Sequence, residues 1–435
     1  MLRLFRPLVF TFHKVTLGLA AVVVVGMLLT FYIWPAQAQD NTTTTPTASA
    51  AQANSIFMPI VANDYDAFLA TRLGYSTSVT PITQYANIRA LHAGWYVDWG
   101  VTQNPVRPSG MTYMPMVRVH QQLTCGIAIT ADRVKCPYVE PHAYDYTPSA
   151  DAIRTFAVAN PGSTWLIGNE MDRLDWAGGN QDEMLPTLYP IAYKELYDII
   201  KGADSTAKVA IGGIIEATPL RLEYLTTIWN KYQEYYGTTM PVDVWNVHNF
   251  VIAEYCRMEP DGAGGQERIC YGGAVPPGAT TNSGAYVGED WKHIDHTAFD
   301  QQIRAFRQWM KDHGQQEKPL IVTEYGVLYN KIDCPQPVPG GCGDPHWVDL
   351  NNPQVIHDFM LWTFDYFANT ADCNLGYTAD DCHLVQRWAW FSLQNVWDFN
   401  PHASLYDKTT KQPLLAGEKF SQYAKNNHAN LAKGY

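Results

Sequence analysis

The sequence lacks the short motifs that mark several large classes of enzyme. No glycine-rich phosphate loop follows a predicted strand, because Gly212-Gly213 and Gly264-Gly265 lack the required pattern. No G-x-S-x-G motif is present, which argues against an esterase triad. None of the eight cysteines has C-x-x-C spacing, so a zinc knuckle is not expected. We therefore predict neither a cofactor nor a metal site.

Positive charge is also scarce. The chain has 30 Lys and Arg against 42 Asp and Glu, a formal net charge of −12. Residues 1–38 hold three of the cations and no anion, so the remainder carries −15. This sign argues against nucleic acid and anionic membrane surfaces as partners. Solubility outside the cell is the simpler explanation of the same charge.

Long apolar runs are absent except near the N-terminus, where VTLGLAAVVVVGMLLTFYIW occupies 15–34. Basic residues precede this run and Ala36-Gln37-Ala38 follows it, a pattern typical of a secretory signal. The run is also about as long as a membrane span, roughly 20 residues, so an uncleaved anchor at 1–38 is the alternative. Both predict an extracellular or cell-surface protein that contacts the membrane only through this segment.

Two further segments follow. Residues 39–56 are rich in Thr, Ala and Ser and have little apolar bulk, so we interpret them as a linker. Residues 57–435 are long enough for one large core, which we expect to be the catalytic domain of a monomer.

The eight cysteines form four neighbouring pairs along the chain. An even number in an exported protein indicates disulfides, although sequence alone does not fix their connectivity. We expect neighbours to pair, each bond closing a short loop and contributing about 2–3 kcal/mol in the chain-entropy model. The expected pairs are Cys125 with Cys136, Cys256 with Cys270, Cys334 with Cys342, and Cys373 with Cys382.

Apolar runs alternate with amphipathic helical stretches along the rest of the chain. The predicted strands are 70–76, 90–99, 113–120, 164–170, 208–214, 242–249, 319–325 and 387–393. The predicted helices are 151–162, 186–203, 220–237, 296–314 and 353–370. Eight strands alternating with helices predict an α/β fold, a single (β/α)₈ TIM barrel.

Two connections in this pattern are long, 250–292 and 326–352, and both follow the C-terminal end of a strand. Barrel enzymes build their active sites from such loops. Two of the expected disulfides lie in these two connections, a third (Cys125 with Cys136) lies in the βα loop after the third predicted strand, and the pair Cys373 and Cys382 lies on the opposite face. The sequence therefore predicts disulfide-stapled loops over an active face.

Two glutamates end predicted strands at that face. WLIGNEMDR (165–173) places Asn169 and Glu170 at the end of the fourth strand, and PLIVTEYG (319–326) places Glu324 near the end of the seventh. A lone Glu at a strand end is explained by solvent exposure or an ion pair with Arg. Two glutamates at the C-terminal ends of two strands of one barrel would face each other across a cleft. One carboxyl then protonates a glycosidic oxygen while the other attacks the sugar.

Asn-Glu on the fourth strand with a second Glu on the seventh resembles clan A of the glycoside hydrolases. The resemblance implies that Glu170 is the acid/base, Glu324 the nucleophile, and that stereochemistry is retained. It implies that Asn169 binds the sugar 2-hydroxyl and that Trp390, in WAWFS, floors the cleft.

Within the clan, several stretches are similar to family 128, the β-1,3-glucanase-like group. They are GWYVDWG, YMPM, IGNEMD, VHNF, VTEYG and WAWFS. Met171 and Asp172 depart from that family's Glu-Pro-Asp, and Asp98 stands where it has Asn. Enzymes like those of family 39 share the two-glutamate pattern.

Other residues are weaker candidates for the site. His248 ends the sixth strand and either orients the nucleophile, contacts sugar, or is simply a packed core histidine. Arg118 would lower the pKa of Glu324 if it reached that carboxylate. Trp95, Asp98 and Tyr325 complete the predicted substrate-binding set, although a buried aromatic is equally explained as core.

A possible metal pattern, His293-Ile-Asp-His296, stands at a helix entry. We interpret Asp295 there as an N-cap rather than as part of a metal site.

Together these features predict an exported hydrolase that cleaves O-glycosidic bonds of a polysaccharide, a glucan-type chain in our interpretation. Retention would proceed through a covalent glycosyl-enzyme on Glu324, with the pKa of Glu170 raised by burial and by the Glu324 charge. Two alternatives share the fold: a non-catalytic carbohydrate-binding or surface scaffold protein, and an envelope transglycosylase.

Overall fold

The computed structural model describes residues 69–78, 81–285, 290–329, 348–394 and 399–432. The expected signal or anchor and the linker lie outside these residues. The chain divides into two units, Met1–Ile60 and Val61–Tyr435, and all the described residues belong to the second unit. Within the described ranges, the helices are all too short or too polar to cross a membrane.

Every predicted strand is present. They are β1 (Ala70–Ser76), β2 (Ala93–Val97), β3 (Thr112–Met114) with β4 (Met116–Gln121), β6 (Thr164–Asn169), β7 (Lys208–Gly213), β8 (Trp245–His248), β11 (Leu320–Tyr325) and β12 (Arg387–Trp390). The third predicted strand is divided at Pro115, because proline has no N–H to donate to a ladder.

The strands pair in parallel, as predicted, but they form two sheets. One has the order β3-β2-β1-β12-β11-β8, and the other places β4, β6 and β7 beside the antiparallel β5 (Tyr144–Thr147). Isolated parallel bridges join Ala210 to Val244 and Ile214 to Val247, next to β7 and β8. The predicted single eight-stranded sheet is therefore interrupted at Pro115 and between β7 and β8.

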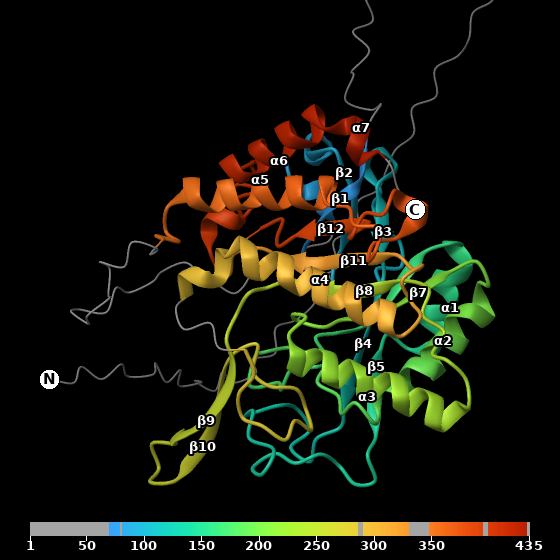
Figure 1. Cartoon of the computed structure of the whole chain (residues 1–435), viewed down its shortest axis with the longest axis vertical. Helices are drawn as coiled ribbons and strands as arrows, with labels where there is room; N and C mark the ends of the chain where they lie inside the picture. The colour runs from blue at the N-terminus through green and yellow to red at the C-terminus, as the bar shows by residue number, and fades with distance from the viewer. Residues whose placement is uncertain (1–68, 79–80, 286–289, 330–347, 395–398, 433–435) are drawn as a thin grey trace, which may run out of the picture. The chain divides into compact units, whose positions relative to one another are not determined.

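The helices surround the strands in Figure 1. The predicted ones are α1 (Ala150–Ala159), α2 (Tyr189–Ala203), α3 (Pro219–Tyr236), α4 (His296–Asp312) and α5 (Pro353–Asn369). The Asp295 side chain caps α4 by accepting from the backbone of Thr297 and Ala298, which confirms its predicted role. The sequence pattern missed α6 (Leu415–Asn426) and α7 (His428–Leu431), which follow the last predicted strand.

Short 3-10 helices complete the described elements. They are η2 (Ile82–Gln84), η3 (Ile88–Leu91), η4 (Pro108–Gly110), η5 (Asp290–Ile294), η6 (Thr378–Asp380) and η7 (Pro401–Ala403).

Four apolar clusters occur in the described part of the chain, and the two largest contain the strands. The larger packs strands against helices. The smaller gathers buried side chains from seven of the strand segments, namely Trp95, Val97, Met114, Met116, Leu166, Ala210, Val244, Ile321 and Ala389. Since successive strand residues point to opposite faces, this second cluster marks the face of each strand turned away from the helices.

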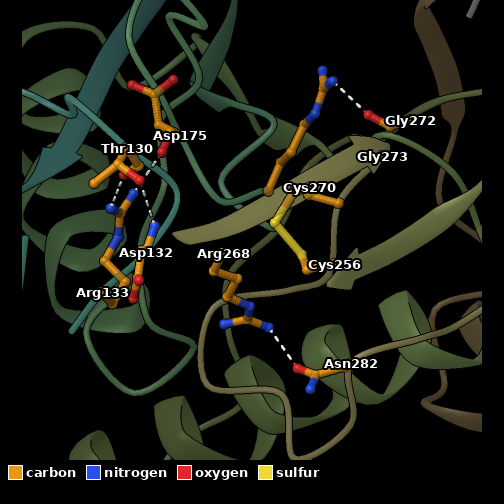
Figure 2. The surroundings of a disulfide bond; sticks show 12 residues. Thr130, Asp132, Arg133, Asp175, Cys256, Arg268, Cys270, Gly272, Gly273 and Asn282 are labelled. Carbon is orange, nitrogen blue, oxygen red and sulfur yellow. Dashed lines mark hydrogen bonds between the residues drawn. A yellow bond between two sulfur atoms is a disulfide. The ribbon is translucent and has the colours of Figure 1, made fainter. Parts of the chain in front are cut away.

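The long connection at 250–292 contains a hairpin that the sequence pattern did not predict. β9 (Glu254–Pro260) pairs antiparallel with β10 (Gln266–Gly272), and the bonded Cys256 and Cys270 stand directly opposite (Figure 2). The disulfides Cys125–Cys136 and Cys373–Cys382 are also confirmed. Cys334 and Cys342 lie outside the described residues.

A fully buried arginine ties this hairpin to the strand that carries Glu170. Arg221, on α3, donates through Nε to Glu254 on β9 at 2.6 Å and pairs with Asp172 at 3.2 Å. Its guanidinium also donates to the carbonyl of Ala274 at 3.1 Å. Because Asp172 lies two residues after Glu170, this network fixes the hairpin relative to the candidate site.

We expect Arg221→Met to lower the free energy of unfolding by about 3–5 kcal/mol at pH 7, because two buried carboxylates lose their cation. Burial raises the pKa of Asp172 to about 6 even beside Arg221, so protonation should reduce the loss at pH 5. Urea unfolding at both pH values measures the change in stability, and Arg268→Met on β10 is the control variant. Equal stability of the two variants at pH 7 would contradict the expectation.

Candidate active site

Glu170 stands where β6 leaves the sheet. Its φ is 51°, in the left-handed region, which a side chain seldom adopts outside sites that hold it there. Its backbone N–H donates to Gly213 at 2.9 Å, and its carbonyl accepts from the N–H of Arg173 at 3.1 Å. The strand thus ends on a carboxylate because a tight turn follows immediately.

Glu324 meets Glu170 across a buried histidine. Nδ1 of His248 lies 3.2 Å from Oε1 of Glu170, and its Nε2 lies 3.6 Å from Oε1 of Glu324. The indole N–H of Trp99 donates to the same Glu324 oxygen. Gly213 leaves room for the ring, since a Cβ there would lie 2.3 Å from His248.

The two carboxylates are close in space although far apart in sequence. One oxygen from each and a ring nitrogen of His248 lie within 4.8 Å of one another. Glu170 and Glu324 are 4% and 5% exposed, so each keeps a small opening to solvent. The structure therefore brings together the two glutamates that the sequence singled out.

Both glutamates line a cavity of about 500 Å³. Asp98 and Asn169, two predicted binding residues, line it as well. The hydroxyl of Tyr113 and the side chain of Thr102 donate to the Asp98 carboxylate at 2.6 and 2.7 Å. By contrast, Asn169 has a buried Oδ1 with no partner. Asn169 is thus available to a ligand, whereas Asp98 is held by its neighbours.

Four predicted binding residues are absent from the cavity lining: His248, which lies between the two glutamates, and three aromatic residues. Trp95, Tyr325 and Trp390 are fully buried and contribute nothing to its lining. The indole N–H groups of Trp95 and Trp390 donate to the carbonyls of Arg72 and Ala403, at 3.1 and 2.6 Å. All three aromatics therefore serve the core.

Further aromatic residues line the cavity, and of these the sequence had offered only Trp99 as a residue that could stack on a sugar. Its aromatic wall consists of Trp99, Trp176, Phe250, Phe391 and Phe399. Phe391 directly follows Trp390 in the WAWFS motif, so this motif does contribute an aromatic residue to the cavity, but it is Phe391 rather than Trp390. Arg173, three residues after Glu170, was missed although that spacing favours an ion pair.

Arg173 holds Glu170 as an anion. Its Nη1 lies 3.0 Å from Oε2 of Glu170, while its Nη2 donates to the carbonyl of Gly272 on β10 at 2.6 Å. Its guanidinium also lies 4.7 Å from the ring centre of Trp176. Burial by itself would raise the pKa of Glu170, but Arg173 and His248 outweigh burial and lower it to about 2.

The pKa of Glu324 is shifted in the opposite direction. Burial raises its pKa to about 7, with the Glu170 charge adding to the effect and His248 opposing it. Arg118 lines the cavity and acts in the predicted direction, but it does not reverse the shift. The prediction that Glu170 has the raised pKa is therefore wrong for the resting site, because Arg173 was overlooked.

His248 and the two glutamates form a cluster whose ligand atoms converge, so a cation is one occupant to consider. Two guanidinium groups disfavour it. Arg173 already pairs with Glu170, and Arg118 lines the same cavity. Burial lowers the pKa of His248, but the two glutamates outweigh it and raise that pKa. Only a neutral imidazole has a lone pair for a metal, so this raised pKa also acts against metal binding.

We expect Arg173→Met to raise the pKa of Glu170 by about 1–3 pH units, because burial disfavours the charged carboxylate and the variant lacks the cation that offsets this effect. His248 would still lower it, Glu324 and Asp172 would raise it, and Arg118 would continue to lower it from across the cavity. A carbon-13 NMR titration of glutamate-labelled protein measures the shift, with Glu170→Gln for assignment and Arg268→Met as control. An unchanged Glu170 titration in Arg173→Met would show that the ion pair is unimportant.

No protein-family model and no curated protein matches the chain. Solved structures that resemble it include glycoside hydrolases. A GH128 subgroup II endo-β-1,3-glucanase from Pseudomonas viridiflava has 13% identity and a TM-score of 0.46, covering 81% of this chain and 97% of its own. A glucosidase from Croceicoccus marinus has 11% identity and a TM-score of 0.42, covering 82% and 67%. Xylanase 10B from Thermotoga petrophila RKU-1 has 11% identity and a TM-score of 0.40, covering 82% and 94%.

Proposed function

We propose that the protein is a retaining glycoside hydrolase that cleaves O-glycosidic bonds of a polysaccharide. The observation that carries this proposal is the pair Glu170 and Glu324, with one oxygen of each within 4.8 Å of the other in the wall of one cavity. Two carboxylates whose oxygens approach this closely can flank a single glycosidic bond. Retaining enzymes have carboxyl groups about 5–5.5 Å apart, and inverting enzymes about 6.5–9.5 Å, so this close approach of the oxygens favours retention.

In this mechanism Glu324 attacks the anomeric carbon and forms a covalent glycosyl-enzyme, while Glu170 donates a proton to the leaving oxygen. Glu170 then removes a proton from the water that releases the sugar. The N–H of Trp99, donating to Glu324, orients the attacking carboxylate.

The resting charge state must change before the first step. Glu170 is the anion of the pair, and Glu324 has the higher pKa. A neutral sugar that enters the cavity and displaces the Arg173 guanidinium would leave Glu170 buried without its main cation. Its pKa then rises, and the proton shared by the pair moves toward Glu170.

The surroundings of the pair suit a carbohydrate. A cavity of about 500 Å³ lies within the range of small-molecule sites, roughly 300–1,000 Å³. Trp99, Phe250, Phe391 and Phe399 offer apolar faces to sugar rings. The unpartnered Asn169 oxygen supports the role that the resemblance implied, a hydrogen bond to the sugar 2-hydroxyl. A glucan-type chain is our substrate proposal.

The proposal includes a catalytic domain at 57–435, a linker at 39–56 and a signal or anchor at 1–38. Three disulfides support a location outside the cell, since such bonds persist in oxidising compartments. We further propose that the two sheets form one (β/α)₈ barrel. The parallel bridges between β7 and β8 support closure of the barrel. The second apolar cluster, to which strands of both sheets contribute, supports it as well.

A panel of β-glucans, xylans and other polysaccharides tests the function through two measurements, release of reducing ends and binding. Release with retained anomeric configuration, observed by proton NMR at early times, supports the proposal. Binding without release would favour the scaffold protein instead. Products longer than the starting oligosaccharide would favour the transglycosylase.

A further inference from the structure

A second cavity adjoins the first one on the side of Glu170. It measures about 370 Å³ and is lined by the end of β4, by the loop that Cys125–Cys136 closes, and by residues 175–183. The two cavities share Trp176, Gly178, Asn180 and Gln181. A ligand that passes over this shared segment would therefore extend from the glutamate pair into the second cavity.

Two buried amide groups at this second cavity lack partners. Gln121 is 5% exposed, and its Oε1 accepts from the N–H of Leu185 at 2.8 Å, which leaves the buried Nε2 as a free donor. Gln181 is 8% exposed and has a buried Oε1 without a donor. A sugar hydroxyl group can satisfy either of them, since it can accept a hydrogen bond from the amide donor or donate one to the amide acceptor.

The charges at the second cavity point to a neutral ligand. Asp145, Asp175 and Glu183 line it, and they would repel a uronate or a sulfated sugar. Arg133, the nearby cation, already pairs with Glu183. Neutral hydroxyl groups are therefore better suited to this lining than carboxylates are.

The walls of this cavity are fixed before any ligand arrives. Arg133 donates through Nε to Glu183 at 2.7 Å and through Nη2 to the carbonyl of Asp175 at 2.7 Å. Figure 2 shows the Arg133 guanidinium with hydrogen bonds to Thr130 of the stapled loop and to Asp175. Lys135 of the same loop pairs with Asp261 of the hairpin turn at 3.3 Å. Such preorganisation reduces the entropy lost when a flexible chain binds.

The position of the cavity identifies which part of a substrate it would hold. Residues 175–183 follow Glu170 along the chain, and β4 pairs with β6, the strand that ends at Glu170. Leu328, which follows β11, lines only the first cavity. Because the proposed acid protonates the leaving oxygen, the leaving saccharide lies on the side of Glu170.

We propose that the second cavity binds sugar residues of the leaving group, and that the enzyme therefore cleaves within chains of a neutral polysaccharide. This inference rests on the proposed function. It assigns Gln121 and Gln181 to hydroxyl groups of a sugar on the leaving side of the cleaved bond. It also assigns the stapled loop 125–136 to the recognition of chain length.

The test compares two kinds of substrate on the full chain. Nitrophenyl β-glycosides carry a small leaving group that does not reach the second cavity, whereas neutral β-glucan oligosaccharides of two to six residues do. For the wild type we expect kcat/KM to rise with oligosaccharide length. Ala128→Trp, which fills the cavity, should lower kcat/KM for the hexasaccharide about tenfold and change nitrophenyl glycoside cleavage less than about twofold.

Gln121→Glu is the second variant, because it keeps the acceptor for Leu185, removes the unused donor, and adds an acidic group to a lining that already contains Asp145, Asp175 and Glu183. It should lower kcat/KM for the hexasaccharide in the same selective manner. Ala263→Trp, on the exposed hairpin turn outside both cavities, is the matched control and should behave as wild type.

Length-independent rates in the wild type would overturn the inference and leave the proposed function standing. So would equal losses on both kinds of substrate in the two cavity variants. A wild-type protein that cleaves neither kind of substrate overturns the proposed function, and the inference with it.

Discussion

Glu324→Gln is expected to lower turnover of every glycoside by about 10⁴-fold or more, because the amide cannot attack the anomeric carbon. The change is isosteric. It also removes a buried carboxyl group whose pKa burial raises to about 7, so the fold should remain intact. Release of reducing ends measures the activity, and thermal unfolding monitors the fold.

The matched control is Glu267→Gln on β10, which makes the same chemical change away from both cavities. It should keep wild-type activity. A Glu324→Gln variant that retained activity near the wild-type level on a polysaccharide would remove Glu324 from the mechanism.

Glu170→Ala is expected to show a strong dependence on the leaving group. Loss of a general acid costs about 10²–10⁴-fold on an unactivated oligosaccharide. A nitrophenolate leaves without a proton, so the first step on a nitrophenyl glycoside should proceed far better. The second step should then be slow, because no base activates water, and a small anionic nucleophile such as azide should restore turnover.

This variant also decides between the two possible assignments of the pair. The resting pKa values are the reverse of those expected for Glu170 as acid, since Arg173 pairs with it. If Glu170 were the nucleophile, Glu170→Ala would be equally inactive on both substrates, and Glu324→Ala would show the leaving-group dependence. Rates of both variants on both substrates, with and without azide, provide the answer.

The strands and most helices were predictable because their signals are local. TWLIGN and LIVTEY each contain a run of three apolar residues, WLI and LIV, and are buried along their whole length, which is typical of strands in a parallel sheet that is covered on both faces. The hairpin β9–β10 was missed because its sequence is mostly polar and rich in charge, and its stability comes from Cys256–Cys270 and Arg221. The division of the sheet at Pro115 follows from proline's missing N–H, which the sequence also contained.

For the site, the sequence by itself determined the two glutamates and the amide beside one of them. Glu170 and Glu324 each end a strand that reads as buried, and parallel strands present their C-terminal ends on one face. Which aromatics line the cavity was not predictable. Trp390 and Phe391 are neighbours in sequence, and only the twist and register of β12 decide that Phe391 lines the cavity.

Only the tertiary structure decided the charge state of the pair and the extent of the cleft. The pKa of each glutamate depends on burial and on groups within a few ångströms, such as Arg173 and His248. The second cavity likewise exists because β4, the stapled loop and residues 175–183 pack together. Electrostatic and packing interactions act through space, and their distances are set by the folded chain rather than by spacing in the sequence.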